Sequence, residues 1–170
     1  KTQNWQKKHT GFIKSAYAKA PYVKDYLPEF EDILNRDIDT LSGMNRQLCA
    51  WSMDKLGIKT QLADVRDFRP RSEVRGDQDE KTNLIIETLK NTGATDYLVG
   101  PASKDYIDET LFKDAGIGLE YKSYDYPPYP QIHGEFMEGL SILDLLFNTG
   151  PDAREYITSR TPDEIAVAQR

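Results

Sequence analysis

The heptapeptide Gly-Pro-Ala-Ser-Lys-Asp-Tyr at residues 100–106 combines residue types that bind anions and transfer protons. Gly100 would let a ligand approach the backbone closely, Lys104 would supply a point charge, and Ser103 would cap a helix or contact a phosphate. The turn is predicted to follow a strand and open a helix, where free N–H groups favour anions. A capped turn is the alternative, because no phosphate-loop or dinucleotide glycine pattern is present.

A second candidate lies at residues 131–136, Gln-Ile-His-Gly-Glu-Phe, in a segment bounded by proline and glycine. His133 is one of two histidines, and an imidazole on a loop is suited to general acid or base chemistry. Glu135 would project to the same side if the segment is extended, which makes a proton-transfer pair conceivable. The alternative is that His133 only hydrogen-bonds to a backbone carbonyl.

Two further segments of the chain contain candidate polar residues. Asp144 lies within the apolar run 140–148, where a carboxylate must find donors because burying it unpaired is costly. Structural use of Asp144 is favoured over catalysis. Near the start of the chain, Lys8 and His9 could reach an anionic ligand beside the stacking face of Trp5, although the pattern alone favours a solvated lysine pair beside a core tryptophan.

The composition excludes several classes of protein and partner. The 170 residues carry a net charge of -6, which offers no overall attraction to nucleic acid, and we expect no nucleic-acid partner. One cysteine allows no intrachain disulfide and favours a reducing, cytoplasmic location. No apolar stretch is long enough for a membrane span. We expect no metal site and no cofactor, because the histidines and the cysteine show no ligand spacing.

Apolar periodicity predicts the elements that must position these residues. Helices are expected over residues 5–20, 22–35 and 40–56, which makes the first third helical. Strands are then expected at 60–63, 96–99 and 119–122, with helices between them at 81–91 and 106–115. This alternation predicts a parallel sheet with right-handed crossovers. A Pro-rich loop, a short apolar helix at 140–148, a last helix from Pro151 and a fraying tail beyond Thr161 complete the chain.

The fold class expected is therefore α/β with three layers, in a single domain over residues 1–170. Its subregions are a helical part at 1–57, a βαβαβ part at 58–123 and a Pro-rich loop with C-terminal helices at 124–170. Three strands are few for so much helix, and the first residue is not Met. We therefore expect a missing N-terminal segment that completes the sheet.

Several of these motifs, in this order, resemble the WbqC-like protein family of bacteria. The resemblance rests on residues 4–9, 18–22, 100–106, 131–136 and 140–148, and covers nearly the whole chain from Trp5 to about Pro151. Members of that family usually begin with an additional α/β segment, which this chain lacks. The resemblance implies a protein of O-antigen or other surface-polysaccharide gene clusters, and a transferase that moves glycine or another aminoacyl group to a sugar intermediate.

The resemblance also implies which residues form the site. A small-molecule substrate, either a nucleotide sugar or an activated acyl donor, would bring phosphate to a cleft shared by the 100–106 turn and the His133 segment. Predicted catalytic residues are His133 and Asp105. Predicted substrate-binding residues are Lys8, His9, Gly100, Ser103, Lys104, Tyr106 and Glu135. A nucleotidyl-transfer or adenylate-forming enzyme and a non-catalytic nucleotide-sugar or protein-binding module stay open as alternatives, and the oligomeric state is not predicted.

Overall fold

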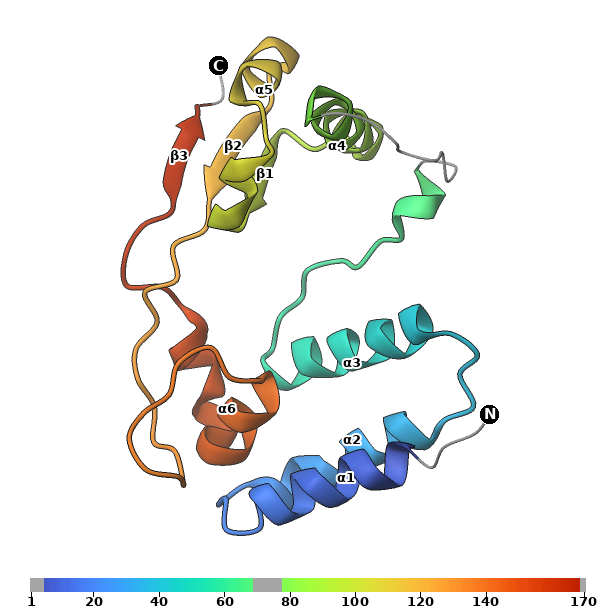
Figure 1. The fold of residues 1–170 in the computed structure, drawn as a ribbon, viewed down its shortest axis with the longest axis vertical. Coiled ribbons are helices and arrows are strands. Elements are labelled where there is room, and N and C mark those ends of the chain that lie inside the picture. Colours follow the sequence, from blue (N-terminus) through green and yellow to red (C-terminus); the bar gives the residue numbers. More distant parts are fainter. Residues whose placement is uncertain (1–4, 69–77, 169–170) are drawn as a thin grey trace. The chain divides into compact units, whose positions relative to one another are not determined.

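The structure, a computed structural model, describes residues 5–68 and 78–168. The chain packs into two compact units (Figure 1). Unit 1 comprises Lys1–Gln61 and Tyr126–Thr158, and unit 2 comprises Leu62–Asp125 and Ser159–Arg170. Each unit has its own hydrophobic core, so each is described by itself. The α/β class is confirmed, whereas the single domain stays a prediction.

Unit 1 begins with the helices expected for the first third of the chain. They are α1 (Trp5–Ala16), α2 (Val23–Asn35) and α3 (Leu41–Lys55). Thr40 caps α3, because its hydroxyl accepts a hydrogen bond from the Gly43 N–H at 3.0 Å. Helix α2 packs against both α1 and α3 (Figure 1). The helical first third is therefore confirmed.

The chain returns to unit 1 through α6 (Ile142–Thr149) and the 3-10 helix η3 (Gly150–Ile157). The short apolar helix expected near 140–148 is thus present, and the last helix is of the 3-10 type. The N–H of Tyr22 donates to the carbonyl of Phe147 at 3.0 Å, which attaches the end of α6 to the start of α2. Gly150 has φ +58°, and a Cβ there would lie 2.5 Å from the Tyr22 ring. Only glycine fits this junction.

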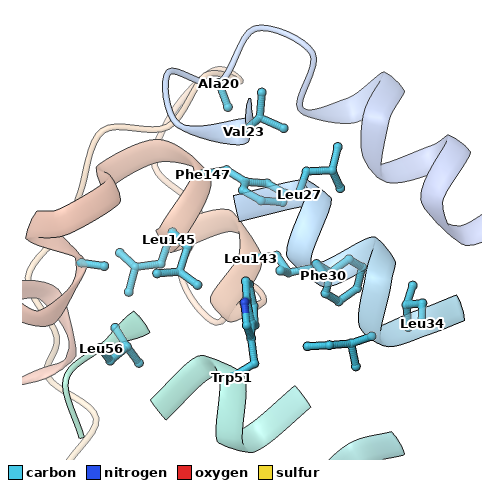
Figure 2. Packing of buried hydrophobic residues seen from close by; sticks show 13 residues of the cluster. Ala20, Val23, Leu27, Phe30, Leu34, Trp51, Leu56, Leu143, Leu145 and Phe147 are labelled. Atoms are coloured by element: carbon cyan, nitrogen blue, oxygen red, sulfur yellow. The ribbon is translucent and has the colours of Figure 1, made fainter. Parts of the chain in front are cut away.

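The core of unit 1 lies between α2, α3 and α6 (Figure 2). Leu146 and Phe147 of α6 are fully buried, and Phe30 of α2 packs against Trp51 of α3 with ring centroids 6.0 Å apart. Burial of each such side chain contributes about 1.5–3 kcal/mol relative to exposure. Because every residue of α6 from Leu143 onward is buried, α6 is the central element of unit 1.

Unit 2 contains a three-stranded mixed sheet in the order β1-β2-β3. Strands β1 (Asp96–Val99) and β2 (Gly118–Tyr121) are parallel, as expected. One of the three expected strands was predicted wrongly: residues 60–63 form no regular structure, and the third strand of the sheet is β3 (Glu164–Val167), which runs antiparallel to β2. The parallel sheet is therefore corrected to a mixed one, built partly from the tail that was expected to fray.

Side-chain contacts between residues 160–163 and residues 122–125 explain why the chain beyond Thr161 is ordered. Asp163 accepts hydrogen bonds from Lys122 Nζ at 2.9 Å and from the Ser123 N–H at 2.8 Å. Asp125 accepts one from the Thr161 hydroxyl at 2.7 Å and pairs with Arg160. The Lys122 ammonium lowers the pKa of the Asp163 carboxyl. These polar side chains, which carry no period-2 pattern, bring β3 to the sheet.

Helices cover one face of this sheet in the described part of unit 2. They are α4 (Gln78–Thr92) and α5 (Glu109–Ala115), and two 3-10 turns accompany them: η1 (Val65–Asp67) and η2 (Pro101–Asp105). Phe112 of α5 and Leu119 of β2 are fully buried in the unit 2 core. On the opposite face, Leu98 and Ile165 are 51% and 64% exposed. The three-layer arrangement is thus not formed by the described residues, and completion of the sheet by a further segment stays a prediction.

Candidate functional site

A buried carboxylate organises the polar interior of unit 1. Asp144 of α6 is 4% exposed, and its Oδ2 accepts hydrogen bonds from the Tyr129 hydroxyl at 2.6 Å and from Gln131 Nε2 at 3.0 Å. The expectation that Asp144 must find donors is confirmed. Both donors are side chains of the Pro-rich segment at residues 124–131. The carboxylate therefore attaches this segment to α6.

Two tyrosines are held in their protonated form beside this carboxylate. Burial raises the pKa of Tyr17 to about 12, and a hydrogen bond to the Asp144 carboxylate adds to the effect. Burial and the same carboxylate also raise the pKa of Tyr129. At neutral pH both phenols therefore stay protonated and act as hydrogen-bond donors.

These pKa shifts predict that the chain loses stability in alkali. Because the folded-state pKa of Tyr17 and Tyr129 lies above the unfolded value of about 10, their contribution is complete below that pH and is lost as the pH rises towards 12. Urea unfolding at increasing pH should show this loss, and Tyr17→Phe with Tyr129→Phe should reduce it. An equally steep loss in the double variant would contradict the assignment.

Gln131 closes the loop that carries His133. Its side-chain oxygen accepts from the Met137 N–H at 2.8 Å, and its Nε2 donates to the Met137 carbonyl at 2.9 Å as well as to Asp144. Gly134 lies inside the loop with φ +61°. One amide thus joins both ends of residues 131–137 to the buried carboxylate, while His133 and Glu135 are exposed on the loop.

The hydrogen bond of His133 defines which ring nitrogen holds a proton. His133 Nε2 lies 2.7 Å from the carbonyl oxygen of Ala16, at the end of α1. Since a carbonyl oxygen only accepts, Nε2 must be the protonated donor. In the neutral imidazole the lone pair then belongs to Nδ1, and the exposed ring offers this nitrogen as a base.

The turn at residues 100–106 is built differently from the expected helix opening. Gly100 leads into η2, which spans only Pro101–Asp105, and α5 begins at Glu109 rather than at Tyr106. The Asp108 carboxylate caps α5 by accepting from the Thr110 N–H at 2.8 Å. The first N–H groups of α5 are therefore faced by an acid of the chain itself. The predicted opening of a helix at Tyr106 is therefore wrong, whereas the anion site at this turn stays a prediction.

Side chains of this turn contact other parts of unit 2. Lys104 Nζ pairs with the Glu164 carboxylate at 2.7 Å and lies 4.7 Å from the centre of the Tyr121 ring. Ser103 is buried, with its hydroxyl 2.8 Å from that of Tyr106. An exposed ion pair of this kind contributes at most about 1 kcal/mol, so an anionic ligand could exchange with Glu164 at little cost.

The candidates on α1 are exposed. Lys8 and His9 face solvent, and the Trp5 ring lies edge-on to His9 with centroids 6.2 Å apart. Trp5 is 39% exposed, so it is not the core residue that the alternative interpretation assumed. Asn4 lies outside the described residues.

The predicted site residues are divided between the two units. Unit 1 holds Lys8, His9, His133 and Glu135, and unit 2 holds Gly100, Ser103, Lys104, Asp105 and Tyr106. His133 is placed against α1, whereas the convergence of the two groups on one cleft stays a prediction. The sequence analysis missed Tyr17, Tyr129 and Gln131. Spacing offered a signal for two of them, because residues 129 and 131 project to one side of an extended segment.

The described residues show neither a cluster of metal ligands nor a membrane-spanning helix. No group of three or more His, Cys, Asp and Glu side chains there is arranged to hold a metal ion. None of the helices in residues 5–68 and 78–168 has the length and apolar character needed to cross a lipid bilayer.

Comparison with known proteins identifies relatives of the chain. The model of the WbqC-like protein family matches residues 1–156. The chain is 32% identical over 156 residues to the uncharacterized protein Rv1507c of Mycobacterium tuberculosis. That match covers 91% of this chain and 64% of the relative, so the chain spans less than two thirds of the relative's length. No solved structure matches. Because the family match covers most of its residues, the chain belongs to the WbqC-like protein family.

Proposed function

We propose that this protein is a transferase of bacterial surface-polysaccharide assembly, which moves glycine or another aminoacyl group to a sugar intermediate in the cytoplasm. Membership in the WbqC-like family supports the setting. The observation that carries the chemistry is the hydrogen bond from His133 Nε2 to the Ala16 carbonyl, because it leaves Nδ1 as the basic nitrogen on an exposed loop.

The proposed step has a simple balance of atoms. Nδ1 of His133 takes a proton from an amino or hydroxyl group of the sugar as that group forms a bond to the acyl carbon. The bond between the acyl carbon and its activating group breaks, and the leaving group departs with the electron pair. His133 is then an imidazolium, whose charge the Ala16 carbonyl stabilises through the same hydrogen bond.

We assign five of the remaining predicted residues to the same reaction. Lys104 would hold a phosphate of the donor or acceptor after exchanging with Glu164, and Asp105 is proposed as a second catalytic group. Both are exposed on η2. Glu135, Lys8 and His9, exposed on unit 1, are proposed to bind substrate.

A direct assay tests the proposal. The full chain is first screened by thermal shift against nucleotide sugars and ATP, because a ligand that binds only the folded protein raises the melting temperature. It is then incubated with a glycyl thioester or glycyl adenylate and the sugar that binds, and the product is detected by mass spectrometry. A glycylated sugar supports the proposal. Selective binding of ATP with nucleotidyl transfer, or sugar binding without any transfer, would overturn it.

A further inference from the structure

One face of α1 is apolar and exposed. Trp5, Phe12 and Ala16 share this face through their i, i+7 and i+11 spacing. Phe12 is 76% exposed and Trp5 is 39% exposed, whereas a neighbouring side of the helix buries Thr10 and packs Ile13 against the unit 1 core. A phenylalanine and a tryptophan presented together on a helix face, beside the core-facing side, indicate a docking surface.

The segment that carries this face is strongly basic. Residues 1–24 contain six lysines and no Asp or Glu, in a chain whose net charge is -6. Lys7 and Lys8 are exposed on α1, and Lys19 and Lys24 are exposed just beyond it. Lys14 is paired with Glu31 of α2 at 2.5 Å. Lys8, three residues after Trp5 and four before Phe12, flanks the exposed aromatic residues, and the basic segment as a whole selects an anionic partner.

We propose that α1 docks onto the surface of an anionic lipid membrane, with Trp5 and Phe12 inserted at the headgroup level, Lys8 beside them at the lipid phosphates, and the other lysines of residues 1–24 adding long-range attraction. A helix with lysines beside exposed aromatic residues is suited to the interface of a bilayer, where it lies in the plane of the membrane. Clustered lysines near the surface add electrostatic attraction. This mode of binding needs no membrane-spanning helix.

The type of basic residue favours lipid over nucleic acid. All six basic residues in the segment are lysine, and the first arginine of the chain is Arg36. Lysine acts as a point charge, whereas directed recognition of phosphates and bases relies on the planar arginine fork. The most exposed aromatic side chain is a phenylalanine rather than a hydrogen-bonding group, which matches insertion into a lipid interface.

The intrinsic tryptophans provide the test. The protein contains Trp5 and Trp51, and Trp51 is 8% exposed in the core, so Trp51→Phe leaves Trp5 as the reporter. The full chain with this change is mixed with phosphatidylcholine vesicles that contain about one third phosphatidylglycerol. We expect a blue shift of Trp5 emission, and co-sedimentation of the wild-type chain with these vesicles but not with pure phosphatidylcholine.

Matched variants distinguish docking from unspecific attraction. Phe12→Ser and the pair Lys7→Gln with Lys8→Gln should each weaken vesicle binding about tenfold. Two controls should leave vesicle binding unchanged. Leu41→Ser replaces an apolar side chain on α3 whose exposure is similar to that of Phe12. The pair Lys90→Gln with Lys113→Gln removes two exposed positive charges from unit 2. No binding to the anionic vesicles, equal loss in the controls, or binding to an RNA or DNA oligonucleotide in place of vesicles would overturn the proposal.

Discussion

Replacing Asp144 by alanine is expected to lower the free energy of unfolding by about 3 kcal/mol, because the half-buried donors around this buried side chain lose their shared acceptor. Tyr129 and Gln131 both donate to the Asp144 carboxylate, and Tyr17 interacts with it. Each buried donor that loses its partner costs about 1–3 kcal/mol. Urea unfolding followed by circular dichroism measures the effect.

Smaller changes at the same cluster should give a graded series. Tyr129→Phe removes one donor together with its hydrogen bond and is expected to cost about 1 kcal/mol. Asp152→Ala, which removes an exposed acid at the start of η3, should change the free energy by less than about 0.5 kcal/mol. An Asp144→Ala variant as stable as Asp152→Ala would show that the buried carboxylate does not hold the Pro-rich segment.

Replacing His133 by glutamine is expected to reduce the proposed transfer reaction by about 10²–10⁴-fold, because the amide lacks a basic nitrogen. The side-chain NH₂ of glutamine still provides a donor for the Ala16 carbonyl, so the loop should keep its place. Substrate binding, measured by calorimetry, should then change little while the rate falls. If His133 had only a structural role, its replacement would not lower the rate while leaving substrate binding unchanged.

A control on the same loop completes this prediction. Glu138 is exposed, and Glu138→Gln should leave both rate and binding as in the wild type. If His133→Gln transfers the acyl group as fast as Glu138→Gln, the general base lies elsewhere in the protein. If instead both binding and rate are lost together, His133 serves to shape the site and not to accept a proton.

The sequence predicted the elements with strong local signals and missed those set by distant contacts. The helices of the first third follow from apolar periodicity and from the Thr40 cap, and β1 was expected at residues 96–99, where it is found. Strand β3 depends on Asp163 and Asp125 contacting residues forty and thirty-five positions away, which no local pattern reveals. The residues 60–63 show the converse, since a short strand-like run without a partner forms no strand.

The candidate site was predictable to a similar extent. His133 was selected because a loop bounded by proline and glycine commonly holds catalytic groups, and the carboxylate of Asp144 because its neighbours are apolar. The connection between them through Gln131 could not be predicted, because one amide bonds to the Met137 backbone and to Asp144 at once. The Lys104 turn was expected to open a long helix, yet a proline-led 3-10 turn and the Asp108 cap intervene.

The protonation of the His133 ring is the point on which the chemistry depends, and nitrogen NMR of the imidazoles measures it directly. With two histidines in the chain, a spectrum of His9→Gln assigns the His133 signals without ambiguity. The structure predicts the tautomer protonated at Nε2, with Nδ1 unprotonated, in the neutral ring. A neutral His133 protonated at Nδ1 would contradict the hydrogen bond to Ala16 and remove the proposed base.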